Sequence, residues 1–328
     1  MDATMPMTNQ KAKKVGGTKT VILSVISTAF FVLLCALVVF PVLAGLLASF
    51  RPGRELIRKG LALDLNVKTM SLTNYAYILS GNEDSIKYFT WFKNSLILTV
   101  VTVLLTLFFC YLIAYGLAMY DFKGKNVLFF IVIATMMVPF EILMLPLYQE
   151  IIGMGLIDTT AGVVLPGICS ASTIFFFRQY MISLPKELME AGRIDGASEY
   201  GICFKIMLPI TKPAFASMAI LCSMGSWNNM LWPMLVYRSA DKFTLPIGLN
   251  TLLTPYGNNY DVLIAGSMFS LIPVFIVFIA FQRYFVDGMT VGEINEKLAG
   301  NTCGFNPTSC ADQLARAVKE AYEKENGK

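Results

Sequence analysis

The sequence predicts an all-α protein that crosses a membrane six times. Of its 328 residues, 55% are hydrophobic and only 15% are charged, whereas soluble proteins contain about 25% charged residues. The apolar residues form six runs that are long enough for helices crossing a bilayer, which need about 20 residues each. The chain contains no histidine, so the commonest general base and the commonest metal ligand are missing. The composition therefore favours a membrane protein, in which a catalytic or zinc centre would have to rest on carboxylates and thiols alone.

The first span is predicted over residues 21–48. This apolar run of 28 residues follows a polar N-terminal segment, 1–20, that contains four lysines. A cleaved signal peptide has a shorter apolar core, of about 7 to 15 residues. We therefore expect the first helix to remain in the protein as an anchor.

The remaining five spans are predicted at residues 95–119, 127–147, 161–181, 213–236 and 262–285. The third span contains Pro139 and Pro146, and the fourth contains Pro166. Proline lacks a backbone donor and disturbs the helix before it. We therefore expect several of these helices to be bent or interrupted.

Lysine and arginine indicate the orientation in the membrane. Six spans place both termini on the same side, and with that side inside, the inner segments hold 17 of the 26 basic residues. Four basic residues just after the first span, Arg51, Arg54, Arg58 and Lys59, weaken the asymmetry. We predict that both termini, and the segment 183–212 between the fourth and fifth spans, are cytoplasmic.

The segment 183–212, which we call the knob, is predicted to form two short helices joined by a bend. Ser183 is expected to cap the first helix, and Pro185 fits its opening turn. Asp195 and Gly196 are expected to end this helix, because glycine readily adopts backbone conformations that are strained for other residues.

The second helix of the knob is predicted to begin near Ala197. Ile202 and Ile206 lie four residues apart and give it an apolar side. Proline disfavours the α conformation in the residue before it, so Pro209 is expected to stop the helix at Leu208. The result would be a compact pair of helices.

The spacing in the knob resembles the cytoplasmic coupling loop in the permease subunits of binding-protein-dependent ABC importers. The pattern comprises Glu190, Ala191, Gly192, Asp195, Gly196, Ala197, Ile206, Leu208 and Pro209. In that family the loop docks in a cleft of the ATPase, and the resemblance implies this role here. Gly192 replaces the usual alanine, which weakens the helix by up to about 1 kcal/mol. The alternative is an ordinary amphipathic connector.

From about residue 20 to residue 292 the chain is similar to the carbohydrate permeases of the maltose importer family. The resemblance includes Asn94-Ser95, Trp227-Asn228-Asn229 and the segment from Gln282 to Gly288. It implies the type I ABC importer permease fold, with cytoplasmic coupling helices. The implied partners are a second permease subunit, two cytoplasmic ATPases and an extracytoplasmic solute-binding protein that faces the loop 237–261.

Two asparagines and one glutamate are candidates for the translocation path. Asn228 and Asn229 lie about 22 Å along the fifth span from Pro213, at 1.5 Å per residue. Amides at that depth either line a polar path or join helices by hydrogen bonds, and both interpretations remain open. Glu141 is expected near the outer surface, where it is either part of the path or an interfacial residue.

We expect this chain to bind no cofactor. Gly16-Gly17-Thr18-Lys19-Thr20 lacks the upstream glycine of a phosphate-binding loop. ATP and magnesium are therefore assigned to the partner ATPases. The tail, 293–328, is predicted to be a cytoplasmic extension with a short amphipathic helix at 312–324. Cys303 and Cys310 are interpreted as linker residues in preference to a metal site or a disulfide.

The sequence thus predicts a permease subunit of an ATP-driven importer of a sugar or oligosaccharide in a bacterial-type cytoplasmic membrane. The permease domain is expected over residues 21–292, and the chain itself is expected to catalyse no reaction and to bind no nucleic acid. Two alternatives remain. One is import of a phosphorylated polyol such as glycerol phosphate, and the other is an ion-coupled secondary transporter, which the scarcity of mid-membrane carboxylates disfavours.

Overall fold

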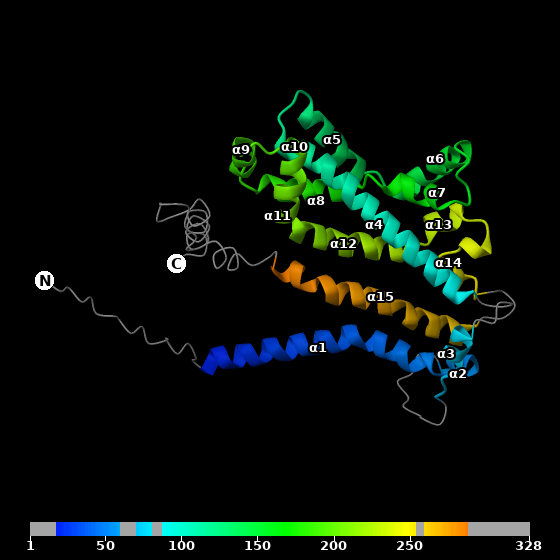
Figure 1. The fold of residues 1–328 in the computed structure, drawn as a ribbon. Helices are drawn as coiled ribbons and strands as arrows, with labels where there is room; N and C mark the ends of the chain where they lie inside the picture. Colours follow the sequence, from blue (N-terminus) through cyan, green and yellow to red (C-terminus); the bar gives the residue numbers. More distant parts are fainter. Residues whose placement is uncertain (1–17, 60–69, 81–86, 254–258, 288–328) are drawn as a thin grey trace. The chain divides into compact units, whose positions relative to one another are not determined.

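The computed structural model describes residues 18–59, 70–80, 87–253 and 259–287 (Figure 1). Every regular element in these ranges is helical, as predicted. The tail helix predicted at 312–324 lies outside the described residues, as do Cys303 and Cys310.

The chain divides into two compact units. The first consists of Met1–Ala76 and Asn259–Met268, and the second of Tyr77–Asn258 and Phe269–Lys328. Three helices of the described residues are long and apolar enough to cross a membrane singly, and three bent helix pairs bring the number of candidate spans to six.

The first unit contains α1 (Thr18–Ser49), α2 (Gly53–Lys59), most of α3 (Thr73–Leu79) and the beginning of α15 (Tyr260–Asp287). The helix α1 contains the first predicted span. The side-chain amide of Asn74 fixes the chain after α1, because it donates to the carbonyl oxygens of Ser49 and Arg51, both at 2.9 Å.

The helix α4 (Tyr88–Met119) is the long element of the second unit, with 32 residues. It begins seven residues before the predicted span 95–119 and has a length of about 48 Å. It packs against α8 (Ala171–Ile182) and α12 (Lys212–Trp227). Figure 1 shows α4 passing from α5 and α10 at one end to α14 at the other.

The third and fourth predicted spans are each broken, as their prolines suggested. The helices α5 (Lys125–Met136) and α6 (Phe140–Gly153) meet at an angle of 103°. Pro139 stands directly before α6, where its missing N–H is tolerated, whereas Pro146 lies inside α6.

In the fourth span, α7 (Thr160–Val164) continues into the short 3₁₀ turn η2 (Leu165–Gly167), which contains Pro166. A bend of 45° separates this segment from α8. Thr159 and Ser170 cap α7 and α8, because their hydroxyl oxygens accept from the backbone N–H groups of Gly162 and Thr173.

The predicted fifth span, 213–236, is wrong as one continuous helix. The helix α12 ends at Trp227, and α13 (Leu231–Val236) begins only after a break of three residues. Asn228 and Asn229 therefore lie in irregular backbone. Beyond α13 follow η4 (Ala240–Lys242) and α14 (Leu245–Asn250).

The apolar core of the second unit extends from the spans into the knob. Tyr111, Phe177 and Phe215 form its centre, with the ring of Phe215 5.0 Å from that of Tyr111 and 4.8 Å from that of Phe177. The Tyr111 hydroxyl donates to the carbonyl oxygen of Cys203 in the knob, at 2.9 Å. Ile202 beside it is fully buried. The knob is thus packed as part of the bundle.

Candidate functional site

The knob has the predicted arrangement of two helices and a glycine bend. The helix α9 (Glu187–Ile194) ends at Asp195, and Gly196 has a φ of +77°. The Gly196 N–H donates to the carbonyl oxygen of Arg193 and the Ala197 N–H to that of Gly192. A left-handed residue after a helix allows such closing hydrogen bonds, and glycine adopts this conformation without strain.

The predicted cap of the first helix is wrong. Ser183 ends the preceding helix α8, and its hydroxyl donates to the carbonyl oxygen of Tyr180 at 2.6 Å. The helix α9 begins only at Glu187, and Lys186 at its N-cap supplies no side-chain hydrogen bond. The serine that caps a knob helix is Ser198.

The second helix comprises α10 (Glu199–Gly201), the π-helical stretch η3 (Ile202–Met207) and α11 (Leu208–Ile210). Ser198 caps α10 by accepting from the Gly201 N–H at 3.1 Å. The second helix thus begins two residues after Ala197, which agrees with the sequence prediction.

Pro209 does not stop this helix, contrary to the prediction. Leu208 is helical, with a φ of −59° and a ψ of −46°, and its N–H donates to the carbonyl oxygen of Cys203, five residues back. The hydrogen-bond pattern therefore changes at η3, and Pro209 falls in the opening turn of α11, where a missing N–H is tolerated. The helix ends instead at Thr211.

Gly192 is the residue through which α9 contacts η3. A β-carbon at this buried position would lie only 2.8 Å from the Cδ1 atom of Ile206 and 3.1 Å from the Cγ1 atom of Ile202. Glycine thus permits a close approach of the two knob helices. The sequence showed only its lower helix propensity, because the facing residue is 14 positions away.

Glu199 joins both knob helices to the end of α4. Its carboxylate accepts from Arg193, with Nε to Oε1 at 2.7 Å and Nη2 to Oε2 at 3.2 Å. The hydroxyl of Tyr120, the C-cap residue of α4, also donates to Oε2 at 2.6 Å. Sequence reasoning missed this cluster, because Tyr120 lies 79 positions from Glu199.

In this cluster Glu199 and Arg193 are ionised at neutral pH, whereas Tyr120 keeps its proton. Arg193 first, and Tyr120 second, lower the pKa of the Glu199 carboxyl, and Glu199 in turn raises the pKa of Arg193. Burial raises the pKa of Tyr120, with a further contribution from Glu199. Because Glu199 and Arg193 are solvent-exposed, the pair mainly orients the helices and adds little stability.

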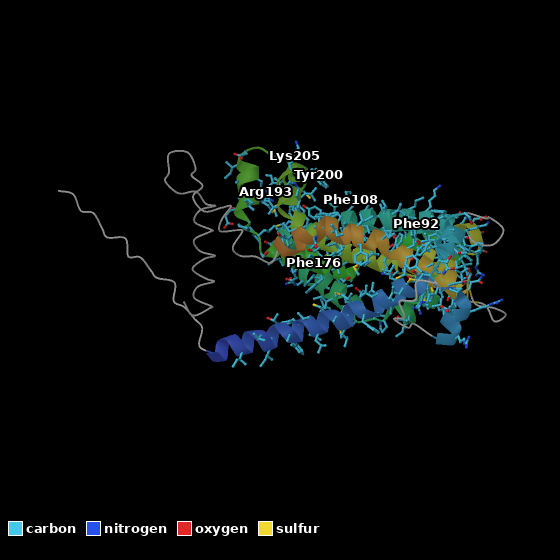
Figure 2. The ribbon with its side chains drawn as sticks, turned by 90° about the horizontal axis from the view of Figure 1, so that it is seen from below. Phe92, Phe108, Phe176, Arg193, Tyr200 and Lys205 are labelled. Carbon is cyan, nitrogen blue, oxygen red and sulfur yellow. The ribbon has the colours of Figure 1, made fainter. Side chains whose placement is uncertain are left out.

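Of the large apolar side chains that the knob exposes, Ile194 and Tyr200 are the most accessible, at 85% and 81%. Figure 2 shows Tyr200 and Arg193 at this end of the molecule, away from Phe92. Large exposed apolar side chains in a segment between two predicted spans indicate a protein contact.

The nine predicted coupling residues differ in how far they are exposed on the knob. Gly192 is buried and Ala197, Ile206 and Leu208 are half-buried, while the exposed members are Glu190, Ala191, Asp195, Gly196 and Pro209.

The breaks between α5 and α6, between η2 and α8 and between α12 and α13 lie beside one small cavity of about 110 Å³. Each broken span contributes residues that flank its break, and the lining includes Phe140, Pro166, Gly167, Ser226 and Asn229. Leu98 and Thr102 of α4 and Trp232 of α13 complete much of the wall. Irregular backbone is tolerated at membrane depth where it is buried in protein or lines a cavity.

The three path candidates differ in position. Asn229 lines the cavity, whereas the side chain of Asn228, the C-cap residue of α12, donates to the carbonyl oxygen of Met224 in that helix, at 3.0 Å. Glu141 is exposed in the first turn of α6 and is not among the lining residues. No group of three acidic or cysteine side chains in the described part of the chain could hold a metal ion.

Comparison with known proteins identifies the family. The model of the binding-protein-dependent transport system inner membrane component matches residues 110–291, more than half of the chain, and the chain belongs to this family. It is therefore a membrane-embedded transport permease subunit. The family implies that it works with ABC transporter partners such as an ATPase and a binding protein. A second model, the TSCPD domain, matches residues 280–322.

Three named relatives are permease proteins. The arabinooligosaccharides transport system permease protein AraQ of Bacillus subtilis is 52% identical over 267 residues, covering 81% of this chain and 94% of the relative. The lactose transport system permease protein LacG of Rhizobium radiobacter is 36% identical, covering 60% and 72%. The sn-glycerol-3-phosphate transport system permease protein UgpE of Brucella suis is 28% identical, covering 78% and 92%.

A solved structure supports the fold. The crystal structure of a bacterial ABC transporter involved in the import of the acidic polysaccharide alginate matches with a TM-score of 0.72. The match covers 83% of this chain and all of that chain, at 24% sequence identity. The predicted ABC importer permease fold is thereby confirmed.

Proposed function

We propose that this chain is one of two permease subunits in an ATP-driven importer of a sugar oligosaccharide, with arabinooligosaccharides as the first candidates. The 52% identity to AraQ supports this substrate class over glycerol phosphate, for which the named relative is 28% identical. The proposed complex contains a second permease, two cytoplasmic ATPases and an extracytoplasmic binding protein. ATP and magnesium bind to the ATPases, and no cofactor binds to this chain.

The knob is the observation that carries the proposal. It presents Ile194 and Tyr200 to solvent, and burying such side chains contributes about 1.5–3 kcal/mol each. An ATPase cleft is the partner we propose for this surface, with Glu190 exposed beside it for a polar contact. The knob's continuity with the core lets movement of the ATPase pass to the spans as a rigid-body motion.

The cavity at the span breaks is the proposed wall of the translocation path. Its volume of about 110 Å³ is below the range of about 300–1,000 Å³ that is usual for ligand pockets. We propose that the second permease supplies the opposite wall. Asn229 would then offer an amide to sugar hydroxyls, while Asn228 serves its own helix.

The orientation and the segment boundaries belong to the same proposal. The knob faces the cytoplasm, and so do the N-terminal segment 1–20 and the extension 293–328. The permease domain extends over residues 21–292. The excess of basic residues in the inner segments supports this orientation.

Reconstitution of the complete complex in proteoliposomes tests the proposal. We expect ATP-dependent uptake of arabinooligosaccharides when a liganded binding protein is added. The panel includes lactose and sn-glycerol 3-phosphate with their binding proteins, and sodium and proton gradients without ATP. Preferred uptake of sn-glycerol 3-phosphate would contradict the sugar assignment. Gradient-driven uptake without ATP would contradict the importer assignment altogether.

A further inference from the structure

The segment 237–245 after α13, which we call the outer loop, is held by the beginning of α4. The side-chain amide of Asn94 donates to the carbonyl oxygens of Asp241 and Phe243, at 2.7 and 3.0 Å. The hydroxyl oxygen of Ser95 accepts from the Leu245 N–H at 2.7 Å. These bonds give the Asn94-Ser95 motif a structural role, because they fix the backbone of the second half of the loop.

Asp158, in the turn between α6 and α7, holds the first half of the outer loop. Its Oδ1 atom accepts from the N–H groups of Arg238 and Ser239, at 2.9 and 3.2 Å. Its Oδ2 atom accepts from the Ser239 hydroxyl at 2.6 Å and from Lys242 Nζ at 3.0 Å. One carboxylate therefore receives four hydrogen bonds from three residues of the loop.

The backbone of Asp158 is in the left-handed region, with a φ of +59°, and this residue alone among the non-glycine residues of the described chain has a positive φ. Aspartate tolerates this conformation better than most residues, but at some cost. The turn is also tied to the end of α13, directly before the loop, because the Asp158 N–H donates to the carbonyl oxygen of Val236 at 2.9 Å. A residue keeps such a strained backbone conformation only where contacts with the surrounding structure hold it there.

Hydrogen bonds position the exposed middle of the outer loop, 238–242, whereas Tyr237 and Leu245 at its two ends are buried. A cavity of about 310 Å³ lies between α4, the turn and the loop, and its lining includes Asn94, Asp158, Thr160, Tyr237 and Lys242. The exposed residues 238–242 lack the dense apolar contacts that fix a core. The same donors, Ser239 first, hold the pKa of the Asp158 carboxyl well below its usual range, so the anchor is ionised at neutral pH.

The helix α4 separates the outer loop from the knob. Lys87, just before α4, pairs with Asp241 of the loop, and Tyr120, at the other end of α4, bonds Glu199 of the knob. The helix between them is about 48 Å long, which exceeds the thickness of the hydrocarbon core, about 30 Å. If the knob lies on the ATPase side, the outer loop lies on the side of the binding protein.

We propose that Asp158 is a positioning residue that holds the outer loop in a preformed arrangement for contact with the extracytoplasmic binding protein. This inference rests on the proposed function. The loop is then already ordered before the binding protein arrives. Binding therefore loses less conformational entropy, and the affinity is higher. Loss of the anchor should therefore weaken the response to the binding protein and leave the maximal rate intact.

Two substitutions distinguish the side-chain hydrogen bonds of Asp158 from the effect of its left-handed backbone. Asp158→Gly removes the four hydrogen bonds and relieves the left-handed backbone. Asp158→Asn retains one acceptor oxygen and the tolerance of a positive φ. Asp121→Asn is the matched control, because Asp121 pairs with Lys125 and Lys186 in an exposed position at the knob end of α4.

The assay measures ATP hydrolysis by the reconstituted complex against the concentration of sugar-loaded binding protein. For Asp158→Gly we expect the half-saturating concentration to rise about tenfold, equivalent to about 1.4 kcal/mol, with an unchanged maximal rate. Asp158→Asn should give a smaller rise, and Asp121→Asn none. In hydrogen exchange, Asp158→Gly should speed exchange in the peptide 237–245 and leave the knob unchanged.

An unchanged half-saturating concentration for Asp158→Gly, or unchanged exchange in the outer loop, would overturn the inference. A fall in the maximal rate alone would also overturn it. If Asp158→Gly fails to assemble, Ser239→Ala decides, because it removes one donor without altering the turn, and no shift would count against the anchor. Absence of any binding-protein stimulation in the wild type would instead refute the proposed function itself.

Discussion

Replacing Gly192 with alanine tests the contact between the two knob helices. The new β-carbon would lie 2.8 Å from the Cδ1 atom of Ile206, whereas carbon atoms in contact are about 3.5–4.0 Å apart. Crowding in a rigid core costs about 1–3 kcal/mol, and this value is an upper bound here because Cδ1 is the end of a flexible side chain that can move away. The higher helix propensity of alanine returns about 1 kcal/mol. We therefore expect a net destabilisation of up to about 2 kcal/mol.

A double-mutant cycle isolates the contact. Ile206→Val removes the Cδ1 atom that the alanine would meet, so it should relieve Gly192→Ala in the double variant. The expected coupling energy is about 0.5–2 kcal/mol, as for other residues in contact. Ala191→Gly, at an exposed position of the same helix, measures the propensity contribution alone.

Thermal unfolding of the purified permease and copurification of the ATPase are the two measurements. Gly192→Ala should lower both the unfolding temperature and the recovered ATPase, and Ile206→Val should restore them in the double variant. Strictly additive effects would refute the reasoning. A Gly192→Ala variant that is stabilised by the full difference in helix propensity would also refute it. The close approach of the two helices would then be unimportant.

Three further predictions concern the knob and the path. Gly196→Leu should impair ATPase copurification more than Gly196→Asn, because no atom lies within 4 Å of a β-carbon there and the cost is the left-handed backbone, about 1–2 kcal/mol; equal effects would argue against this. Asn229→Leu should impair uptake with normal assembly, whereas Asn228→Leu should chiefly affect assembly; the reverse pattern in uptake and copurification assays would remove Asn229 from the path. Glu199→Gln should reduce coupled hydrolysis a few-fold at neutral pH. The pKa of Glu199 is lowered in the folded state. Its stabilising contribution is therefore present above the usual pKa and is lost as the pH falls through the folded-state pKa. If Glu199→Gln lost as much thermal stability in acid as the wild type, that role would be contradicted.

Local signals in the sequence predicted the helical spans and the glycine bend. The length of an apolar run determines whether a helix can cross the bilayer, and residues 21–48 satisfy that condition without reference to any other segment. The breaks near Pro139 and Pro166 follow from a missing backbone donor. Gly196 could be predicted because its left-handed conformation is a property of one residue.

Tertiary structure decided the features that join distant segments. The break at Asn228 and Asn229 contains no proline, so no local signal predicted it, and in the structure it lies beside the cavity that the breaks of two other spans also line. The role of Gly192 depends on Ile206, and the role of Asp158 depends on donors 80 or more positions away. Even Pro209 departed from its local rule, because the π-helical stretch before it changed the hydrogen-bond pattern. Local rules describe the conformation that a residue favours in isolation, whereas packing determines which distant donor, acceptor or methyl group it meets.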